Sequence, residues 1–78
     1  MTRRDRFARE TWRVRFTRAG IVEREFRGPS DRCRVIFGIW VSDMLTRRTG
    51  CVELERRRVG AARFRTIAAC HFPGGFAW

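Results

Sequence analysis

Apolar and polar residues alternate along two stretches of the N-terminal half of the chain. In residues 12–16, every second side chain is Trp, Val or Phe, and arginines lie between them. In residues 21–26, Val22 and Phe26 share one parity and two glutamates share the other. A period of two is typical of a strand with one buried face and one exposed face. The two stretches therefore predict an antiparallel hairpin.

The loop of this hairpin decides which residues face one another. A loop over Arg18-Ala19-Gly20 ends in glycine, at the position where three-residue loops turn left-handed. A two-residue loop would instead set Phe16 against Glu23. The longer loop matches apolar side chains on one face and Arg with Glu on the other. The predicted pairs are Phe16 with Val22, Trp12 with Phe26, Arg15 with Glu23 and Arg13 with Glu25.

A second hairpin is predicted towards the C-terminus on the same grounds. Val52 and Leu54 alternate with glutamates, and Phe64 alternates with arginines. A loop over residues 58–60 again ends in a glycine, Gly60. The predicted pairs are Leu54 with Phe64, Glu53 with Arg65 and Glu55 with Arg63.

Between the two hairpins, the apolar residues change to helical spacing. A Gly-Pro break is followed by Ser30, which is a residue type that caps helix N-termini. Arg47 and Arg48 suit the negative end of a helix dipole, and Gly50 can end the helix. A buried strand over residues 33–41 is the alternative, because that run is rich in β-branched and aromatic residues; length and caps favour the helix. The apolar positions at helical spacing are Cys33, Ile36, Phe37, Trp40, Val41 and Met44, whereas Val35, Ile39 and Leu45 break the pattern.

The predicted fold class is α+β, with two β-hairpins flanking one helix (ββαββ). We expect an antiparallel sheet with the helix on one face, which leaves the Arg/Glu face in water. A chain of 78 residues has the size of a single small domain. Its predicted parts are a basic N-terminal arm over residues 1–10, the ββαββ domain over residues 11–71 and an aromatic C-terminal tail over residues 72–78.

The composition indicates a folded, strongly basic protein. Hydrophobic residues make up 44% and aromatic residues 13% of the chain, which is richer than a disordered sequence. The net charge of +10 favours nucleic acid or an acidic protein surface as a partner. All 18 basic residues are Arg, and Lys, Asn, Gln and Tyr are absent. Because those residues have AT-rich codons, a GC-rich genome would by itself favour Arg over Lys, so the preference for Arg says little about function.

The cysteines and the apolar runs bear on the cellular location. Cys33, Cys51 and Cys70 are odd in number and widely spaced, which argues against a secreted disulfide framework. Residues 1–10 are charged throughout, unlike a signal peptide. The longest apolar run covers residues 35–41 and is far shorter than a membrane span. We expect a cytoplasmic protein without a membrane partner.

The sequence contains few residues that would support catalysis or metal binding. His71 is the single histidine, and a Gly-rich phosphate loop and a nucleophile motif are both missing. Together with Cys33, Cys51 and Cys70 it would complete a set of four zinc ligands. The close Cys pairing of zinc sites is missing, however, and buried cysteines are the favoured interpretation. We expect no enzyme, no cofactor and no metal.

The arginines outside the predicted Arg/Glu pairs gather in three places. These are the N-terminal arm, the end of the helix and the second hairpin loop, and the last two should lie at opposite ends of the third strand. The aromatic tail either caps the open side of the sheet or forms a candidate hydrophobic anchor for a partner. The candidate partner- or nucleic-acid-binding residues are Arg3, Arg4, Arg6, Arg9, Arg47, Arg48, Arg56, Arg57 and Arg58, and the candidate anchor is Phe72, Phe76 and Trp78.

Two functions agree with this pattern. The first is a small non-catalytic binding protein that presents an arginine-rich surface to a polyanion, either nucleic acid or an acidic face of a nucleoprotein complex. The alternative is a phage or mobile-element encoded inhibitor that docks on a host nucleic-acid-handling complex. Anti-CRISPR proteins share that general form, but the comparison rests on no common residues. A homodimer is compatible with either function, and no RNA-recognition, zinc-finger or helix-turn-helix pattern is present.

Overall fold

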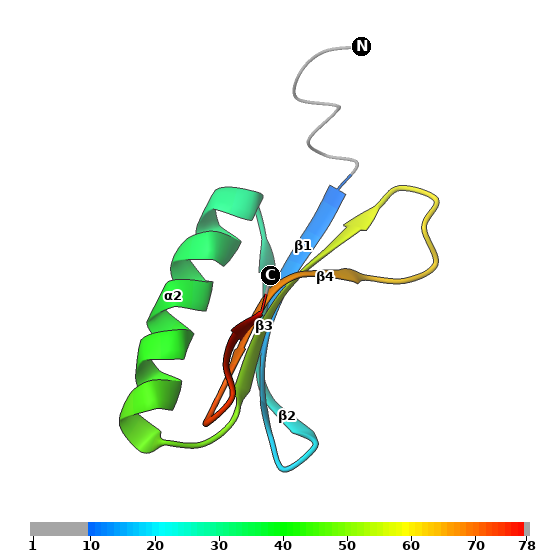
Figure 1. Cartoon of the computed structure of the whole chain (residues 1–78). Coiled ribbons are helices and arrows are strands. Elements are labelled where there is room, and N and C mark those ends of the chain that lie inside the picture. The colour runs from blue at the N-terminus through cyan, green and yellow to red at the C-terminus, as the bar shows by residue number, and fades with distance from the viewer. Residues whose placement is uncertain (1–9, 78) are drawn as a thin grey trace.

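The computed structural model describes residues 10–77, with five strands and one helix in that part of the chain (Figure 1). The five strands form one antiparallel sheet in the order β2-β1-β3-β4-β5. The predicted ββαββ order is confirmed, and the short strand β5 follows it. The elements are β1 (Glu10–Arg18), β2 (Ile21–Gly28), α2 (Ser30–Arg47), β3 (Cys51–Arg58), β4 (Arg65–His71) and β5 (Gly75–Ala77).

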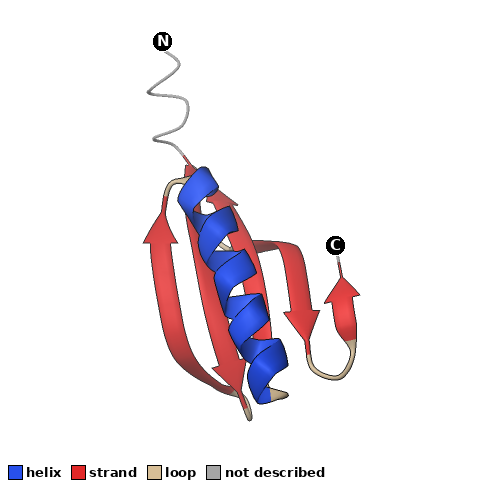
Figure 2. Cartoon of the chain, turned by 90° about the vertical axis from the view of Figure 1, so that its left-hand side faces the viewer, coloured by secondary structure: helices blue, strands red, loops and turns tan. Residues whose placement is uncertain are grey.

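The helix α2 packs on one face of the sheet, over β1, β2 and β3 (Figure 2). The core lies in this layer, because alternate residues of the strands and one stripe of the helix are buried against each other. The predicted position of the helix is confirmed. No helix in residues 10–77 is both long and apolar enough to cross a bilayer. The core residues are Trp12, Val14, Phe16, Cys33, Phe37, Val41, Met44, Val52, Leu54, Ala68 and Cys70.

The faces of α2 follow the predicted helical spacing, which rules out the strand alternative for residues 33–41. The six apolar positions at that spacing are buried or partly buried. The three residues that break the pattern remain in solvent, with Val35 62%, Ile39 56% and Leu45 47% exposed. The helix is therefore apolar on part of its outer surface as well as on its core side.

The ends of α2 differ from the prediction by one or two residues. Ser30 is the first helical residue rather than the N-cap, and Pro29 precedes it in an extended conformation. The carbonyl of Pro29 accepts the first helical hydrogen bond from the N–H of Cys33, at 3.0 Å. At the other end, Arg48 turns left-handed (φ 55°) and donates its N–H to the carbonyl of Met44, so the helix stops before Gly50.

The register predicted for the first hairpin is wrong. Its turn has two residues, Ala19 and Gly20, both at positive φ (52° and 78°), a conformation whose twist matches that of the flanking strands. A β-bulge then adds one residue on β2 opposite the step from Phe16 to Thr17. The pairs are Arg18 with Ile21, Thr17 with Val22, Phe16 with Arg24, Arg15 with Glu25, Val14 with Phe26 and Trp12 with Gly28.

With a two-residue turn alone, the apolar residues of β2 would face the side of the sheet away from α2. The extra residue of the bulge returns Phe26 to the α2 side. The side chains of β1 that face α2 are therefore those predicted, although their partners on β2 differ. Val22 is not one of these partners and is 38% exposed. Arg24 takes the place opposite Phe16, and its Nη1 lies 3.1 Å from Oδ2 of Asp43 on α2. The apolar match expected at this position is thus replaced by an ion pair between sheet and helix.

The register of the second hairpin is also wrong. β3 and β4 pair from Arg56 with Arg65 onwards, so the connection is longer than the predicted loop over residues 58–60. Gly60 still forms a turn, in which the N–H of Ala61 donates to the carbonyl of Arg58 at 3.0 Å. The small residues of β4 fill the core in place of Phe64. The pairs are Val52 with Cys70, Glu53 with Ala69, Leu54 with Ala68 and Glu55 with Thr66.

Candidate anion-binding pocket

A hollow of about 310 Å³ opens where β3 and β4 separate at one end of the sheet. Among residues 10–75, its lining consists of four arginines and one small residue and includes no acidic residue. The loop between the strands (yellow to orange in Figure 1) contributes Ala61 and Arg63 to the lining of the hollow. We call this hollow the arginine pocket. Its lining residues are Arg56, Arg58, Ala61, Arg63 and Arg65.

Strand parity explains how these arginines converge. Arg56 and Arg58 share the parity of the buried Leu54, so both face the α2 side of the sheet. Arg65 is the direct Cα partner of Arg56 on β4. Two cations at directly opposite positions on neighbouring strands are destabilising. The pocket therefore gathers like charges at a structural cost.

Carboxylates do not offset this charge within the described part of the chain. The six ion pairs found in residues 10–75 use other arginines, and none includes a guanidinium of the pocket. The residue Glu10, which faces Arg58 across β1 and β3, accepts a hydrogen bond from Trp12 Nε1 at 3.2 Å instead. Within this part of the chain the four guanidinium groups have no carboxylate partner, so they can interact with solvent or with a bound anion.

Trp12 supports the inner side of the pocket. Trp12 is 6% exposed, and two arginines from different elements lie near its ring. The guanidinium carbon of Arg56 is 5.7 Å from the ring centroid, and that of Arg34 on α2 is 5.4 Å away. Guanidinium groups near an indole ring are held by cation–π attraction. Arg56 is thus positioned by a core residue, and the N-terminal part of α2 adds positive charge at the same end of the molecule.

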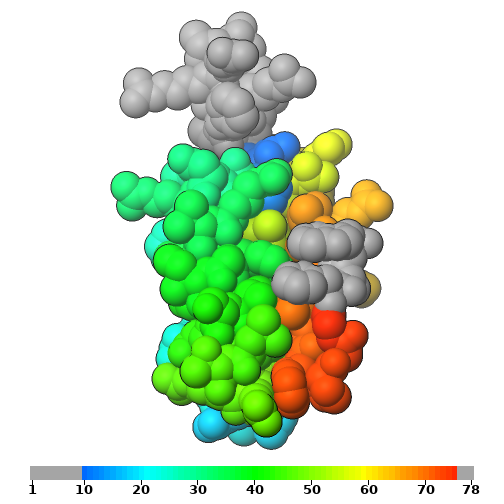
Figure 3. Space-filling model, turned by 60° about the vertical axis from the view of Figure 1, so that its left-hand side comes forward, coloured from blue at the N-terminus to red at the C-terminus, as the bar shows by residue number. Residues whose placement is uncertain are grey.

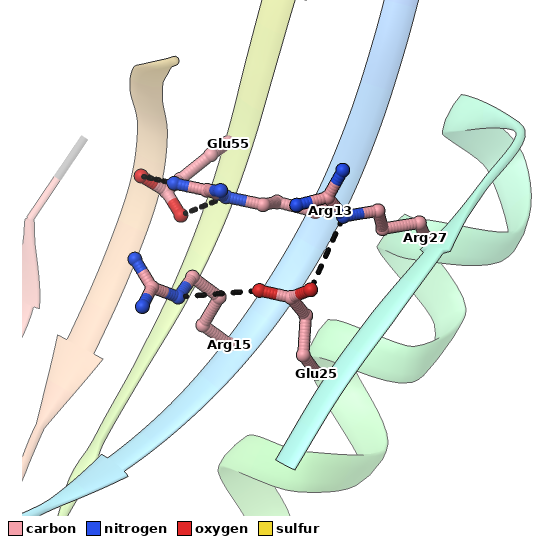
Figure 4. Close-up of polar contacts among 5 residues, drawn as sticks. All are labelled: Arg13, Arg15, Glu25, Arg27 and Glu55. Carbon is pink, nitrogen blue, oxygen red and sulfur yellow. Dashed lines mark hydrogen bonds and ion pairs between the residues drawn. The ribbon is translucent and has the colours of Figure 1, made fainter. Parts of the chain in front are cut away.

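Phe64 anchors the pocket loop from the opposite face of the sheet. The guanidinium carbon of Arg13 lies 3.6 Å from its ring centroid, and that of Arg57 lies 5.2 Å away. Arg13 in turn donates from Nε and Nη2 to the two carboxylate oxygens of Glu55, at 2.8 and 3.4 Å (Figure 4). Glu55 is only 7% exposed. The loop is therefore tied to a nearly buried ion pair in the middle of the sheet.

The same outer face carries a second ion-pair group beside the first. Glu25 of β2 accepts from Nε of Arg27 at 3.1 Å and lies 3.5 Å from Nε of Arg15 on β1 (Figure 4). These groups are more exposed than Arg13 and Glu55. The outer face thus balances most of its charges internally, unlike the arginine pocket.

The predicted binding residues are partly separated by the structure. Arg56 and Arg58 lie in the pocket, but Arg57 points to the other face, near Phe64. Arg47 and Arg48 lie at the far end of β3, as expected, and Arg47 pairs with Asp43 at 3.3 Å. Phe72 is 39% exposed in the turn before β5. The remaining candidates lie outside the described residues or side chains: Arg3, Arg4, Arg6, Arg9, Phe76 and Trp78.

Arg63 and Arg65 are the pocket residues that sequence reasoning missed. The predicted register assigned both to glutamates of β3, whereas the observed register places Thr66 and Ala69 opposite those glutamates. One signal was available in the sequence. No acidic residue follows Glu55, so the five arginines after it form an unbalanced group.

The cysteines belong to the core and its margin. Cys33 and Cys70 are buried and Cys51 is partly buried, and burial raises the pKa of all three thiols above the ordinary value. The nearby carboxylate of Glu53 raises the pKa of Cys51 further. Within the residues that the structure describes, no group of three or more His, Cys, Asp or Glu side chains is arranged to hold a metal ion.

Comparison of the chain with protein-family models, with curated proteins and with solved structures gives no match. The function is therefore inferred from the arginine pocket and its surroundings.

Proposed function

We propose that this protein is a small, non-catalytic cytoplasmic binding protein whose arginine pocket binds the phosphates of a nucleic acid. The observation that carries the proposal is the direct pairing of Arg56 with Arg65 in a hollow whose described lining residues include no carboxylate. A bound phosphate would supply the negative charge that this arrangement lacks. Guanidinium groups bind phosphate oxygens through paired hydrogen bonds, which suits them to this ligand.

The pocket is suited to the nucleic-acid backbone rather than to its bases. As far as residues 10–75 line it, the pocket offers guanidinium groups and the methyl group of Ala61, and no aromatic side chain on which a base could stack. Asn and Gln, which read adenine, are absent from the whole chain. Phosphate contacts position a protein but carry no sequence information. We therefore expect binding that discriminates little between sequences and weakens as salt rises.

The test is a matched pair of substitutions, Ala61→Glu and Ala62→Glu. Both residues are exposed neighbours in the same loop, and both substitutions change the net charge equally, but only Ala61 lines the pocket. Ala61→Glu should weaken binding to a labelled oligonucleotide by about tenfold or more, measured by fluorescence anisotropy, because it places a carboxylate among the guanidiniums. Its salt slope should fall by about 0.7–0.9 for each phosphate that the variant no longer neutralises.

Ala62→Glu is expected to cause a clearly smaller loss of affinity. Equal losses from both substitutions would mean that net charge alone governs binding and that the pocket has no specific role. If the unaltered protein binds neither DNA nor RNA at low salt, the proposal is wrong. That result would favour the inhibitor that docks on an acidic face of a nucleic-acid-handling complex.

A further inference from the structure

In the part of the chain that the structure describes, one edge of the sheet is open along a full strand. β2 is eight residues long and forms the outermost strand on its side, whereas the short strand β5 covers the other edge (Figure 2). Within residues 10–77, β2 pairs with β1 alone. The outer backbone N–H and carbonyl groups of such an edge can pair with another strand.

An apolar hollow of about 320 Å³ lies beside this edge, between β2 and α2. Phe26 contributes from the strand, and Val35 and Ile36 contribute from the helix. Ile39, which is one helical turn beyond Val35, extends the apolar surface and is 56% exposed. Figure 3 shows the outer surface of α2 with β2 (cyan) next to it. Apolar surface next to an open edge is typical of a protein–protein contact.

We propose that β2 pairs antiparallel with β2 of a second copy of this chain, around a two-fold axis at Phe26. The charges of the strand select this register. With the axis at Phe26, Glu25 of each copy faces Arg27 of the other, and the two phenylalanines face each other. An axis at Glu25 would oppose two glutamates, and an axis at Arg24 would oppose two arginines. Opposite charges at facing positions are stabilising, and like charges are destabilising.

The bulge in β2 agrees with this register. It disturbs the strand near Glu23, and the residues from Arg24 to Gly28 keep a regular pairing with β1. Pairing centred on Phe26 uses this regular half of the strand. Phe26 packs against the core on the α2 side, so a two-fold axis perpendicular to the sheet puts both helices on the same side. The two apolar hollows then lie next to each other across the new strand pair.

The dimer goes beyond the proposed function and does not depend on it. Each copy keeps its own arginine pocket, which is formed at β3 and β4 and is separated from the β2 edge by β1. A dimer therefore presents two pockets to one ligand, and linked sites bind more tightly than single sites. Association of the chains can be measured without nucleic acid, so its failure is distinguishable from failure of the pocket.

The sharpest test exchanges the facing charges. Glu25→Arg and Arg27→Glu should each raise the dimer dissociation constant by about tenfold or more in analytical ultracentrifugation, since each sets like charges face to face. An equimolar mixture of the two variants should recover association as a heterodimer, because the introduced arginine then faces the introduced glutamate. Glu23→Arg makes the same charge change within the bulge and should leave the dimer intact. Circular dichroism melting establishes that each variant is folded.

A second pair of variants avoids the strand altogether. Val35→Glu alters an exposed side chain beside the edge and should also weaken the dimer, whereas Leu45→Glu on the same helix does not touch the hollow and should not. A sedimentation mass of 9.3 kDa for the unaltered chain at its highest soluble concentration would overturn the proposal. Folded charge variants whose mixture fails to associate would overturn the register.

Discussion

The guanidinium carbon of Arg13 lies 3.6 Å from the centroid of the Phe64 ring, and this contact joins the pocket loop to the centre of the sheet. Phe64 stands between two pocket arginines in the sequence but points to the opposite face. The ring therefore fixes where the chain turns from the loop into β4. Because Arg63 and Arg65 flank Phe64, the contact between Phe64 and Arg13 on the outer face also positions these two pocket arginines on the face towards α2.

Phe64→Ala should weaken nucleic-acid binding although it removes no charge. The loop would no longer stack on Arg13, and the pocket arginines would be held less firmly. We expect about a threefold to tenfold loss of affinity, since a cation–π contact contributes about 0.5–2 kcal/mol. Ile21→Ala removes an exposed apolar side chain at the β1–β2 turn, at the opposite end of the sheet from the pocket, and serves as the control in the same anisotropy titration. Equal affinities for both variants would contradict the anchoring role of Phe64.

Arg13→Gln should destabilise the protein more than Arg18→Gln does. The side chains of the pair Arg13–Glu55 are 15% and 10% exposed, whereas those of Arg18–Glu23 are 52% and 31% exposed. Removing Arg13 leaves the carboxylate of Glu55 nearly buried without its partner, at a cost of about 1–3 kcal/mol. An exposed pair contributes about 0–1 kcal/mol. Urea unfolding of both variants measures the difference, and similar free energies of unfolding would show that burial of the pair is unimportant.

Two glycine substitutions should change stability in opposite directions. Gly50 has φ +103°, and a Cβ there would lie 2.9 Å from Cζ of Phe16 and 3.1 Å from the carbonyl oxygen of Thr17. Gly50→Ala should therefore cost about 1–3 kcal/mol. Gly38 lies inside α2 with open space around its Cα, so Gly38→Ala should add about 0.5–1 kcal/mol through helix propensity. Thermal melting decides both, and a stabilised Gly50→Ala variant would refute the described helix–strand connection.

The cysteine thiols should react slowly in the folded protein. Burial raises their pKa values, so less thiolate is present at neutral pH than for an ordinary thiol. Alkylation by iodoacetamide, followed by mass spectrometry, should be fastest at the partly buried Cys51 and much slower at Cys33 and Cys70. Denaturant should abolish these differences. Equal rates at all three cysteines in the folded state would contradict their described burial.

The same thiols give stability a dependence on alkaline pH. Because the folded pKa is raised, their contribution is fully present below the pKa of an unfolded thiol. It is lost as the pH rises from that value through the folded pKa, since the unfolded chain ionises first. The melting temperature should therefore fall in this range, and a Cys33→Ala variant should show a smaller fall.

The fold class could be predicted because the alternation of apolar and polar residues determines which face of a strand is buried. It does not determine which residues pair across neighbouring strands. Trp12, Val14 and Phe16 face the helix in the predicted register and in the observed one. The register of the first hairpin depends on a β-bulge, and no residue type near Glu23 predicts a bulge at that position. In the second hairpin, the short side chains of Ala68 and Cys70 fill the core beside α2, a role that the pattern assigned to Phe64.

The candidate site was predictable only in part, for a related reason. The density of arginines after Glu55 indicated Arg56 and Arg58, which line the pocket. Strand parity sends Arg57 to the opposite face, where it lies near Phe64. Arg63 and Arg65 join the pocket because the connection between β3 and β4 is long enough to turn back over the strand end. The alternation of residue types within a strand does not predict how long the connection to the next strand is.

Within residues 10–77 of a single chain, the bulge lies on a strand that has one neighbour, and this has a consequence for how the chain can change in length. An additional residue on β2 has to be accommodated by β1 alone, and the side chains of β1 that face α2 keep their places. An added residue inside β1 would shift its pairs with β2 and β3 together. Descendants of this sequence could therefore gain or lose one residue near Glu23 with the core unchanged, whereas the length of β1 would have to be conserved.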